Sequence, residues 1–308
     1  MKRIKFCVIA TVVVLATACN KEKDDQNQMT MDTKAPNVFL HLAGSGTATI
    51  DWGDGTEIEK RILYEIDDMG DWNSGLLDKY IFRHDYSKTS THNIKITGEN
   101  ITHLSCSKNQ LILLEIKKNA SLTYLHCNDN QLSNLDVSMN TSLNYLYLSG
   151  NQLKELDISN NTALRRLTCF SNHLSKLIIV HNTSLTDLYC HNNQLPGLDV
   201  SMNTNLQKLH CGQNQIDILD VSKNSELLEL YCGINRLTTL DVSNNTMLKE
   251  LFCDNNLLST GALNTLFETL HSDTVSSGKI IEISRNPGTN DCDKSIAENK
   301  GWGVSIFE

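Results

Sequence analysis

The central half of the sequence repeats every 21 residues. Leucines recur at this interval from Leu104 to Leu251, and an asparagine five residues after each leucine recurs with them. The unit that begins at Leu122, LTYLHCNDNQLSNLDVSMNTS, represents eight copies that follow one another without insertion or deletion. A period of this length predicts a solenoid, in which each repeat forms one turn and buries its apolar face against its neighbours.

The pattern within a repeat predicts the path of each turn. In LxxLxCxxNxL the apolar residues point inward, and the LxC tripeptide is a parallel strand, so each turn advances the solenoid by about 4.8 Å. The asparagine is expected to be buried, with its amide bonded to backbone groups that have no other partner. The return segment LDVSxNT alternates and lacks helical periodicity, so we expect it to be extended or 3₁₀. The fold class is therefore mainly β.

Residues 101–258 resemble the leucine-rich-repeat proteins, which belong to the α/β horseshoe class. We assign residues 99–258 to a solenoid of about eight turns. The 21-residue unit, with cysteine in a position that is usually leucine, resembles the cysteine-ladder repeats of the internalin-J type. Internalins are surface adhesins and invasion proteins, so the resemblance implies a recognition role without identifying a ligand.

Seven cysteines share one repeat position and form what we call the cysteine ladder: Cys106, Cys127, Cys169, Cys190, Cys211, Cys232 and Cys253. Disulfides are disfavoured because in-register side chains on parallel strands point the same way. A metal is disfavoured because ligands in a row cannot converge on one ion. Leu148 occupies the same position between Cys127 and Cys169, which favours free thiols used as small apolar side chains.

The N-terminus predicts export and lipidation. Three cationic residues precede an apolar run too short to span a bilayer, and small residues lead to Cys19. Residues 1–18 resemble a lipoprotein signal peptide, with acylation of Cys19; cleavage of a plain signal near Ala18 is the alternative. Residues 19–35 are polar and are expected to form a flexible tether. The chain would then be an outer-membrane lipoprotein facing the exterior, held only by the lipid on Cys19.

The net charge of the chain limits the classes of partner that it is expected to bind. Loss of three cationic residues with the signal changes the net charge from −9 to −9 − 3 = −12. This balance argues against nucleic acid as a partner. We expect a monomer that needs no cofactor.

The two ends of the solenoid require caps, because a terminal turn exposes its core. In residues 36–98, alternating stretches and the segment IDWGDGT resemble a PKD-type, immunoglobulin-like β-sandwich. Asp51 and Asp54 there suggest calcium or turn hydrogen bonds, and we favour turns. Residues 259–308 predict a small α/β cap, with a helix after Ser259, a strand at 279–283, a helix at 292–299 and a last strand at 304–307.

No catalytic motif or metal-ligand spacing stands out, so we predict neither an enzyme nor a metal site. An aspartate recurs on the return segment in five repeats and is interrupted by Ile178. Backbone hydrogen bonding is favoured over calcium for these aspartates. They are Asp136, Asp157, Asp199, Asp220 and Asp241.

The residue between the inward leucine and cysteine of each strand must point outward, and this column is rich in rings. Its ring-bearing members, with three neighbours in a flanking column, are the predicted ligand contacts on the concave face. They are His126, Tyr147, Tyr189, His210, Tyr231 and Phe252, flanked by Tyr124, Tyr145 and Arg166. Such rings suit a protein or glycan ligand; ring stacking that stabilises the sheet is the alternative, and both roles can hold together. Two functions follow: surface recognition or adhesion, and a structural spacer or scaffold in an envelope complex.

Overall fold

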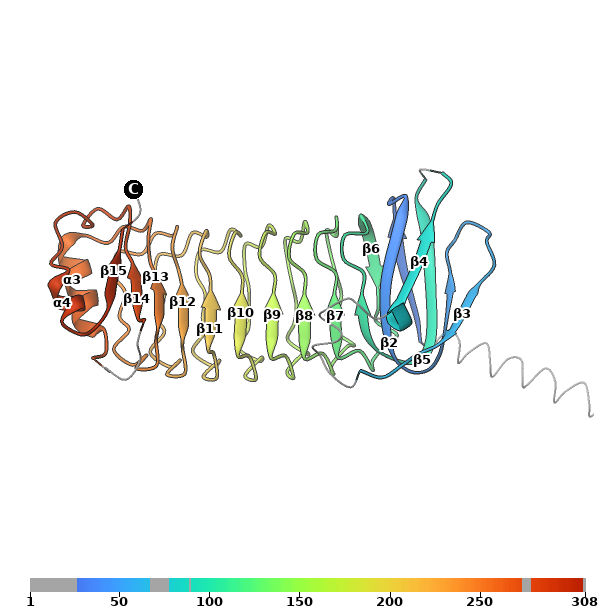
Figure 1. The fold of residues 1–308 in the computed structure, drawn as a ribbon, viewed down its shortest axis with the longest axis horizontal. Coiled ribbons are helices and arrows are strands. Elements are labelled where there is room, and N and C mark those ends of the chain that lie inside the picture. Colours follow the sequence, from blue (N-terminus) through green and yellow to red (C-terminus); the bar gives the residue numbers. More distant parts are fainter. Residues whose placement is uncertain (1–26, 67–77, 89, 273–277, 307–308) are drawn as a thin grey trace, which may run out of the picture.

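The computed structural model describes residues 27–66, 78–88, 90–272 and 278–306. The predicted signal peptide and Cys19 lie outside these residues. A row of short strands forms an elongated solenoid, with a β-rich cap at the N-terminal end and two helices at the C-terminal end (Figure 1). The solenoid and the mainly β fold are as predicted.

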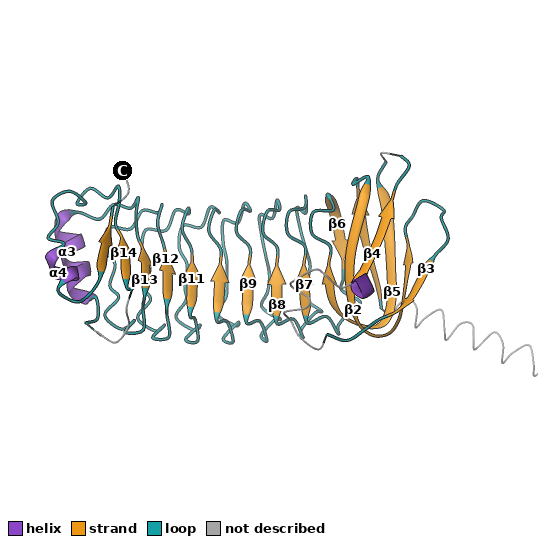
Figure 2. Ribbon diagram, viewed as in Figure 1, coloured by secondary structure: helices purple, strands orange, loops and turns teal. Residues whose placement is uncertain are grey.

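Seven three-residue strands form the body of the solenoid, one in each turn. They pair in parallel and in register, so that each central leucine lies beside the leucine 21 residues further on. These strands are β7 (Tyr124–His126), β8 (Tyr145–Tyr147), β9 (Arg166–Thr168), β10 (Asp187–Tyr189), β11 (Lys208–His210), β12 (Glu229–Tyr231) and β13 (Glu250–Phe252). The return segments are loops (Figure 2), extended with alternating burial, as the sequence predicts.

The cysteine ladder lies inside the core. All seven thiols are free and fully buried, and Leu148 fills its position in the same row without exposure. Burial raises the pKa of Cys106, Cys169 and Cys211 to about 12. These thiols are packing groups, as predicted, and their protonated form is strongly favoured.

The recurring asparagine joins consecutive turns. Asn172 Nδ2 donates to the carbonyl of Leu148 in the preceding turn (3.0 Å) and to that of Cys169 (3.1 Å), and its Oδ1 accepts from Leu153 N (3.0 Å). The same bonds recur at Asn130, Asn151, Asn193, Asn214, Asn235 and Asn256. Each amide thus satisfies buried backbone groups of two turns, which confirms the predicted role.

A second asparagine column, at the opposite end of the return segment, donates to carbonyls of the preceding turn, and sequence analysis missed it. Asn182 Nδ2 donates to Ile158 O (3.0 Å) and Asn161 O (2.9 Å), both in the preceding turn. The column comprises Asn140, Asn161, Asn182, Asn203, Asn224 and Asn245. Its 21-residue recurrence in LDVSxN was visible, but no role was assigned to this asparagine.

The N-terminal cap is antiparallel and continues into the solenoid sheet. It contains β1 (Gln28–Thr33), β2 (Asn37–Asp51), β3 (Glu59–Ile62), β4 (Ile81–Asp85), β5 (His92–Ser105), β6 (Leu111–Glu115) and the 3₁₀ helix η1 (Asp78–Tyr80). β5 pairs antiparallel with β1 and β2, and its last residues pair in parallel with β7. The expected boundary at residue 98 therefore lies within a strand. The PKD-type resemblance stays a prediction.

β1 corrects part of the expected tether at residues 19–35. Met29, Met31 and Thr33 alternate inward and are fully buried, while β1 pairs with both β5 and β6. Two apolar residues in a polar stretch gave too weak an alternation to indicate a strand. β1 also contacts Asn119, which lies one repeat before the second asparagine column and accepts from Asn140; Asn119 Nδ2 lies 3.4 Å from Met29 Sδ.

The C-terminal cap matches its predicted elements. Ser259 accepts from Ala262 N (3.2 Å) and caps α3 (Thr260–Thr269), which buries Leu263, Leu266 and Phe267 on the last layer. The remaining elements are β14 (Ile280–Glu282), α4 (Ser295–Glu298) and β15 (Gly303–Ser305). β14 and β15 extend the parallel sheet by two strands. Among the described residues, no helix has the length and apolarity needed to cross a membrane.

Substitution of a ladder cysteine tests the packing role. Cys190→Ser should lower the free energy of unfolding by roughly 1 to 3 kcal/mol, because it places a hydroxyl in an apolar layer without a suitable partner. Denaturant titration measures the change, and Cys190→Ala separates lost volume from added polarity. Rapid labelling of the native thiols, or disulfides between ladder positions in mass spectra, would contradict the packing role.

Candidate functional site

The outer face of the parallel sheet carries two columns of side chains, one on each side of the buried leucines. The third strand position holds the predicted ring column. His126, Tyr147, Tyr189, His210, Tyr231 and Phe252 are half-buried there. Thr168 interrupts the column and is buried. Strand register places consecutive members beside one another, as predicted.

The rings contact one another along this column. Tyr189 meets His210 edge-on at a centroid distance of 4.6 Å. His210 and Tyr231 stack at 4.0 Å with planes 8° apart, and Phe252 follows Tyr231 at 4.4 Å. The flat faces of His210 and Tyr231 therefore cover each other. The rings brace the sheet, and the same packing fixes their positions on the surface.

The first strand position holds charged groups that pair across strands. Arg166 Nη2 lies 3.2 Å from Asp187 Oδ1. Glu229 binds both Lys208 and His210, the latter at 3.1 Å. Burial alone would raise the pKa of Glu229, but hydrogen bonds from Lys208 and His210 lower it. These pairs order the polar side of the face.

Two predicted contacts lie at the cap. Tyr124 is only 3% exposed and packs with Ala43 and Tyr80 of the cap, so it is no part of the accessible surface. Its burial could not be predicted, because the covering residues are distant in sequence. Tyr145 is half-buried beside this cluster. Arg166, in the next strand, remains on the open face in its pair with Asp187.

A hollow of about 450 Å³ opens beside the C-terminal part of the ring column. His210, Tyr231 and Phe252 line it together with Gly212 and Gly233. These glycines occupy the repeat position directly after the cysteine ladder. Other turns carry side chains there: Asn128, Ser149, Phe170, His191 and Asp254.

Sequence analysis missed this hollow. Gly212 and Gly233 follow the cysteine ladder in two successive repeats and were visible in the sequence. We had examined this repeat position only as far as His191. We call the site the glycine hollow.

The aspartates suggested for calcium make turn hydrogen bonds instead. The aspartates of the return column accept from a backbone N–H two residues further on, at 2.8 to 3.0 Å. Asp51 binds Gly53 N, and Asp54 binds Thr56 N and His84. Among the described residues, no group of three or more His, Cys, Asp or Glu side chains is arranged to hold a metal ion.

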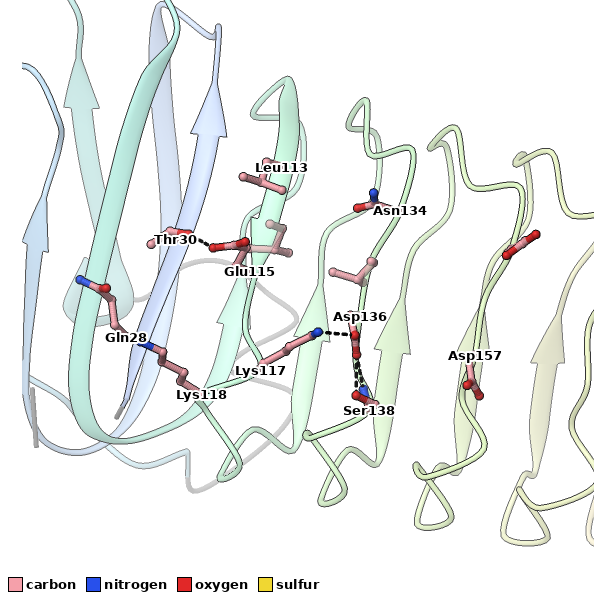
Figure 3. Close-up of a pocket in the computed structure, with 13 residues that line it drawn as sticks. Gln28, Thr30, Leu113, Glu115, Lys117, Lys118, Asn134, Asp136, Ser138 and Asp157 are labelled. Atoms are coloured by element: carbon pink, nitrogen blue, oxygen red, sulfur yellow. Dashed lines mark hydrogen bonds and ion pairs between the residues drawn. The ribbon is translucent and has the colours of Figure 1, made fainter. Parts of the chain in front are cut away.

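A second hollow, of about 890 Å³, lies where the cap meets the first return segments (Figure 3). Several of its polar side chains are directed at one another. Lys117 Nζ lies 2.6 Å from Asp136 Oδ2, and Thr30 donates to Glu115 at 2.9 Å. Because these groups satisfy each other, the outer sheet face is the better candidate for ligand contact.

The parallel sheet, the leucine-lined core and the 21-residue period together define a leucine-rich-repeat solenoid. Solved structures of this kind match the chain. The functional domain of InlJ from Listeria monocytogenes, which includes a cysteine ladder, is 30% identical with a TM-score of 0.57; the match covers 68% of this chain and 50% of that one.

Internalin C2 from the same species is 26% identical with a TM-score of 0.51, and the match covers 54% of this chain and 77% of that one. The chain thus spans half the length of the InlJ domain. No protein-family profile and no curated protein matches the sequence.

Histidines at the face make stability dependent on pH. Burial lowers the pKa of His103 to about 4, and it also lowers the pKa of His126, His191 and His210. The unfolded chain therefore binds protons first as the pH falls below about 6.5. The free energy of unfolding should decrease as the pH falls from about 6.5 toward 4.

Urea unfolding across this range, with NMR titration of the imidazoles, measures the effect. His103→Gln should lose less stability over the same interval, because this group no longer contributes. A His103 midpoint near 6.5 in the folded protein would contradict the assignment.

Proposed function

We propose that the protein binds a macromolecule at the cell surface through the outer face of the parallel sheet, and that it acts by recognition and not by catalysis. The observation that carries this proposal is the column of half-buried rings, held in register on a rigid sheet beside ordered charged pairs. Aromatic side chains fixed in this way lose little entropy on binding and commonly dominate interfaces.

The solenoid also supplies the extended surface that a macromolecular partner needs. Consecutive strands present the same position about every 4.8 Å. The ring column from Tyr189 to Phe252 therefore spans four strands, about 14 Å. A protein segment or an oligosaccharide can contact several turns at once. The internalin resemblance, which implies recognition, supports the same class of function.

We further propose that Cys19 carries the lipid that holds the protein at the outer membrane, facing outward. The support is the order of cationic, apolar and small residues before Cys19. Such an anchor would hold the solenoid near the membrane and leave its face open to soluble or cell-bound partners.

A ring variant tests the binding face. Labelled protein is screened on a glycan array and against a peptide library, and each ligand found is titrated with the variants. Tyr189→Ala should weaken binding about 30-fold, because loss of an aromatic anchor costs about 2 kcal/mol. Ile218→Ala is the matched control, since Ile218 is 76% exposed on the return side.

The opposite pattern would favour the spacer or scaffold function. If Tyr189→Ala lowers the melting temperature but leaves the affinity for an identified ligand intact, the rings serve only to brace the sheet. Thermal unfolding of each variant, recorded beside the titrations, separates the two roles.

Substitution of the lipidated residue tests the anchor. Cys19→Ala should release the protein from membranes or leave the uncleaved precursor, because the lipid is the proposed attachment. Membrane fractionation and the mass of the mature N-terminus report the result. A variant that is still processed and needs detergent for extraction would rule out this anchor.

A further inference from the structure

We propose that the glycine hollow is the anchor site of this face, where a protein partner inserts an apolar side chain that has a lysine or arginine beside it. The inference rests on the proposed function and names the partner's chemistry. Its lining includes Ile234, Gly233 and Asp254.

Ile234 has an unusual backbone for its residue type. Its φ is +56°, in the left-handed region that β-branched side chains rarely adopt. Equivalent turn positions hold Lys108, Asp129, Gly150, Ser171, Asn192, Gln213 and Asn255. Its side chain is also 45% exposed, so burial does not offset the strain. An exposed apolar group in a strained position is expected where it contacts a partner.

The glycines make the space that the anchor would fill. In earlier turns, Phe170 and His191 occupy the same repeat position and stack at 4.3 Å. At Gly212 and Gly233 this row of side chains stops, and the hollow lies there beside Tyr231 and Phe252. Rings and Ile234 make up most of the side chains that line this space, with Gln213 and Asp254 as the polar ones, which favours an apolar group from the partner.

Asp254 gives the hollow its charge. Its Oδ1 lies only 2.2 Å from the place that a Cβ of residue 233 would occupy, so the carboxylate leans over Gly233 because this residue has no side chain. Asn255 Nδ2 donates to the other oxygen at 2.9 Å. No lysine or arginine lines the hollow, and burial keeps His191 and His210 neutral at pH 7 by lowering their pKa. A cationic group beside the anchor complements this carboxylate.

A glycan fits the hollow less well. Sugars stack on open ring faces, and the faces of His210 and Tyr231 cover each other at 4.0 Å. The Phe170 and His191 rings are paired in the same manner. The geometry therefore favours a side chain inserted among rings over a pyranose laid upon one.

The probe is a phage-displayed library of random peptides, selected on the purified full chain and followed by titration of synthetic peptides from the enriched pool. Enriched sequences should share an apolar residue adjacent to lysine or arginine. Ile234→Asn should weaken their binding about 30-fold or more and raise the melting temperature, because asparagine tolerates the left-handed backbone. A purely structural role for Ile234 would not move affinity and stability in opposite directions.

Two further variants keep the test independent of one substitution. Asp254→Asn should weaken binding and reduce its dependence on salt, since it removes the complementary charge. Ser171→Asn, at the same left-handed position outside the hollow, is the matched control and should leave affinity unchanged.

Several outcomes would overturn the inference. These are an unenriched library, enrichment of acidic peptides, or equal binding by Ile234→Asn. If peptides bind Tyr189→Ala more weakly but bind Ile234→Asn as well as the unmodified protein, the proposed binding face is supported and the proposed anchor site is refuted. If the protein binds glycans on the array and no peptide is found, the proposed recognition function is supported, but the proposal of a protein partner is refuted.

Discussion

Hydrogen bonds from buried asparagine amides to backbone carbonyls hold successive turns together. Backbone bonds between turns continue beyond each three-residue strand, as from Cys190 N to His210 O (2.9 Å), and the asparagine amides bind further carbonyls of the same turns. Asn172 and Asn182 serve the two ends of one turn and bind the turn before it. Because each bond also fixes the register of the neighbouring strand, the alignment of leucines, cysteines and surface rings depends on these two columns.

The caps continue the column that contains Asn172 and are therefore part of the solenoid. Asn109 donates to Phe39 O (2.7 Å) and accepts from Phe39 N (3.0 Å), so β2 stands in for a preceding turn. At the other end, Asn286 donates to Cys253 O (3.0 Å), as a repeat asparagine would. One hydrophobic cluster runs from Met29 to Trp302. Capping in this way covers the core at both ends of the solenoid.

Features that repeat could be predicted from the sequence, and features that depend on contacts outside the repeat could not. The period alone placed the strands, the buried thiols and the ring column, since one position fixes all others 21 residues away. The burial of Tyr124 depends on Ala43 and Tyr80, which belong to the cap. β1 was missed because its partners in β5 and β6 are at least 59 residues away. The hollow was missed because it arises where two turns depart from the repeat.

Such departures matter because regularity limits specificity. Where every turn carries a ring, as from Tyr189 to Phe252, each ring spends part of its surface on its neighbour and the face becomes rigid. Rigidity lowers the entropy lost on binding but leaves little surface that distinguishes one partner from another. The turns with Gly212 and Gly233 combine a rigid face with a distinctive surface. The stacked rings stay in place, and the absence of side chains at the two glycines leaves a shaped, charged hollow. In a repeat protein, selectivity is thus concentrated where the column changes, and the regular turns on both sides hold that change in position.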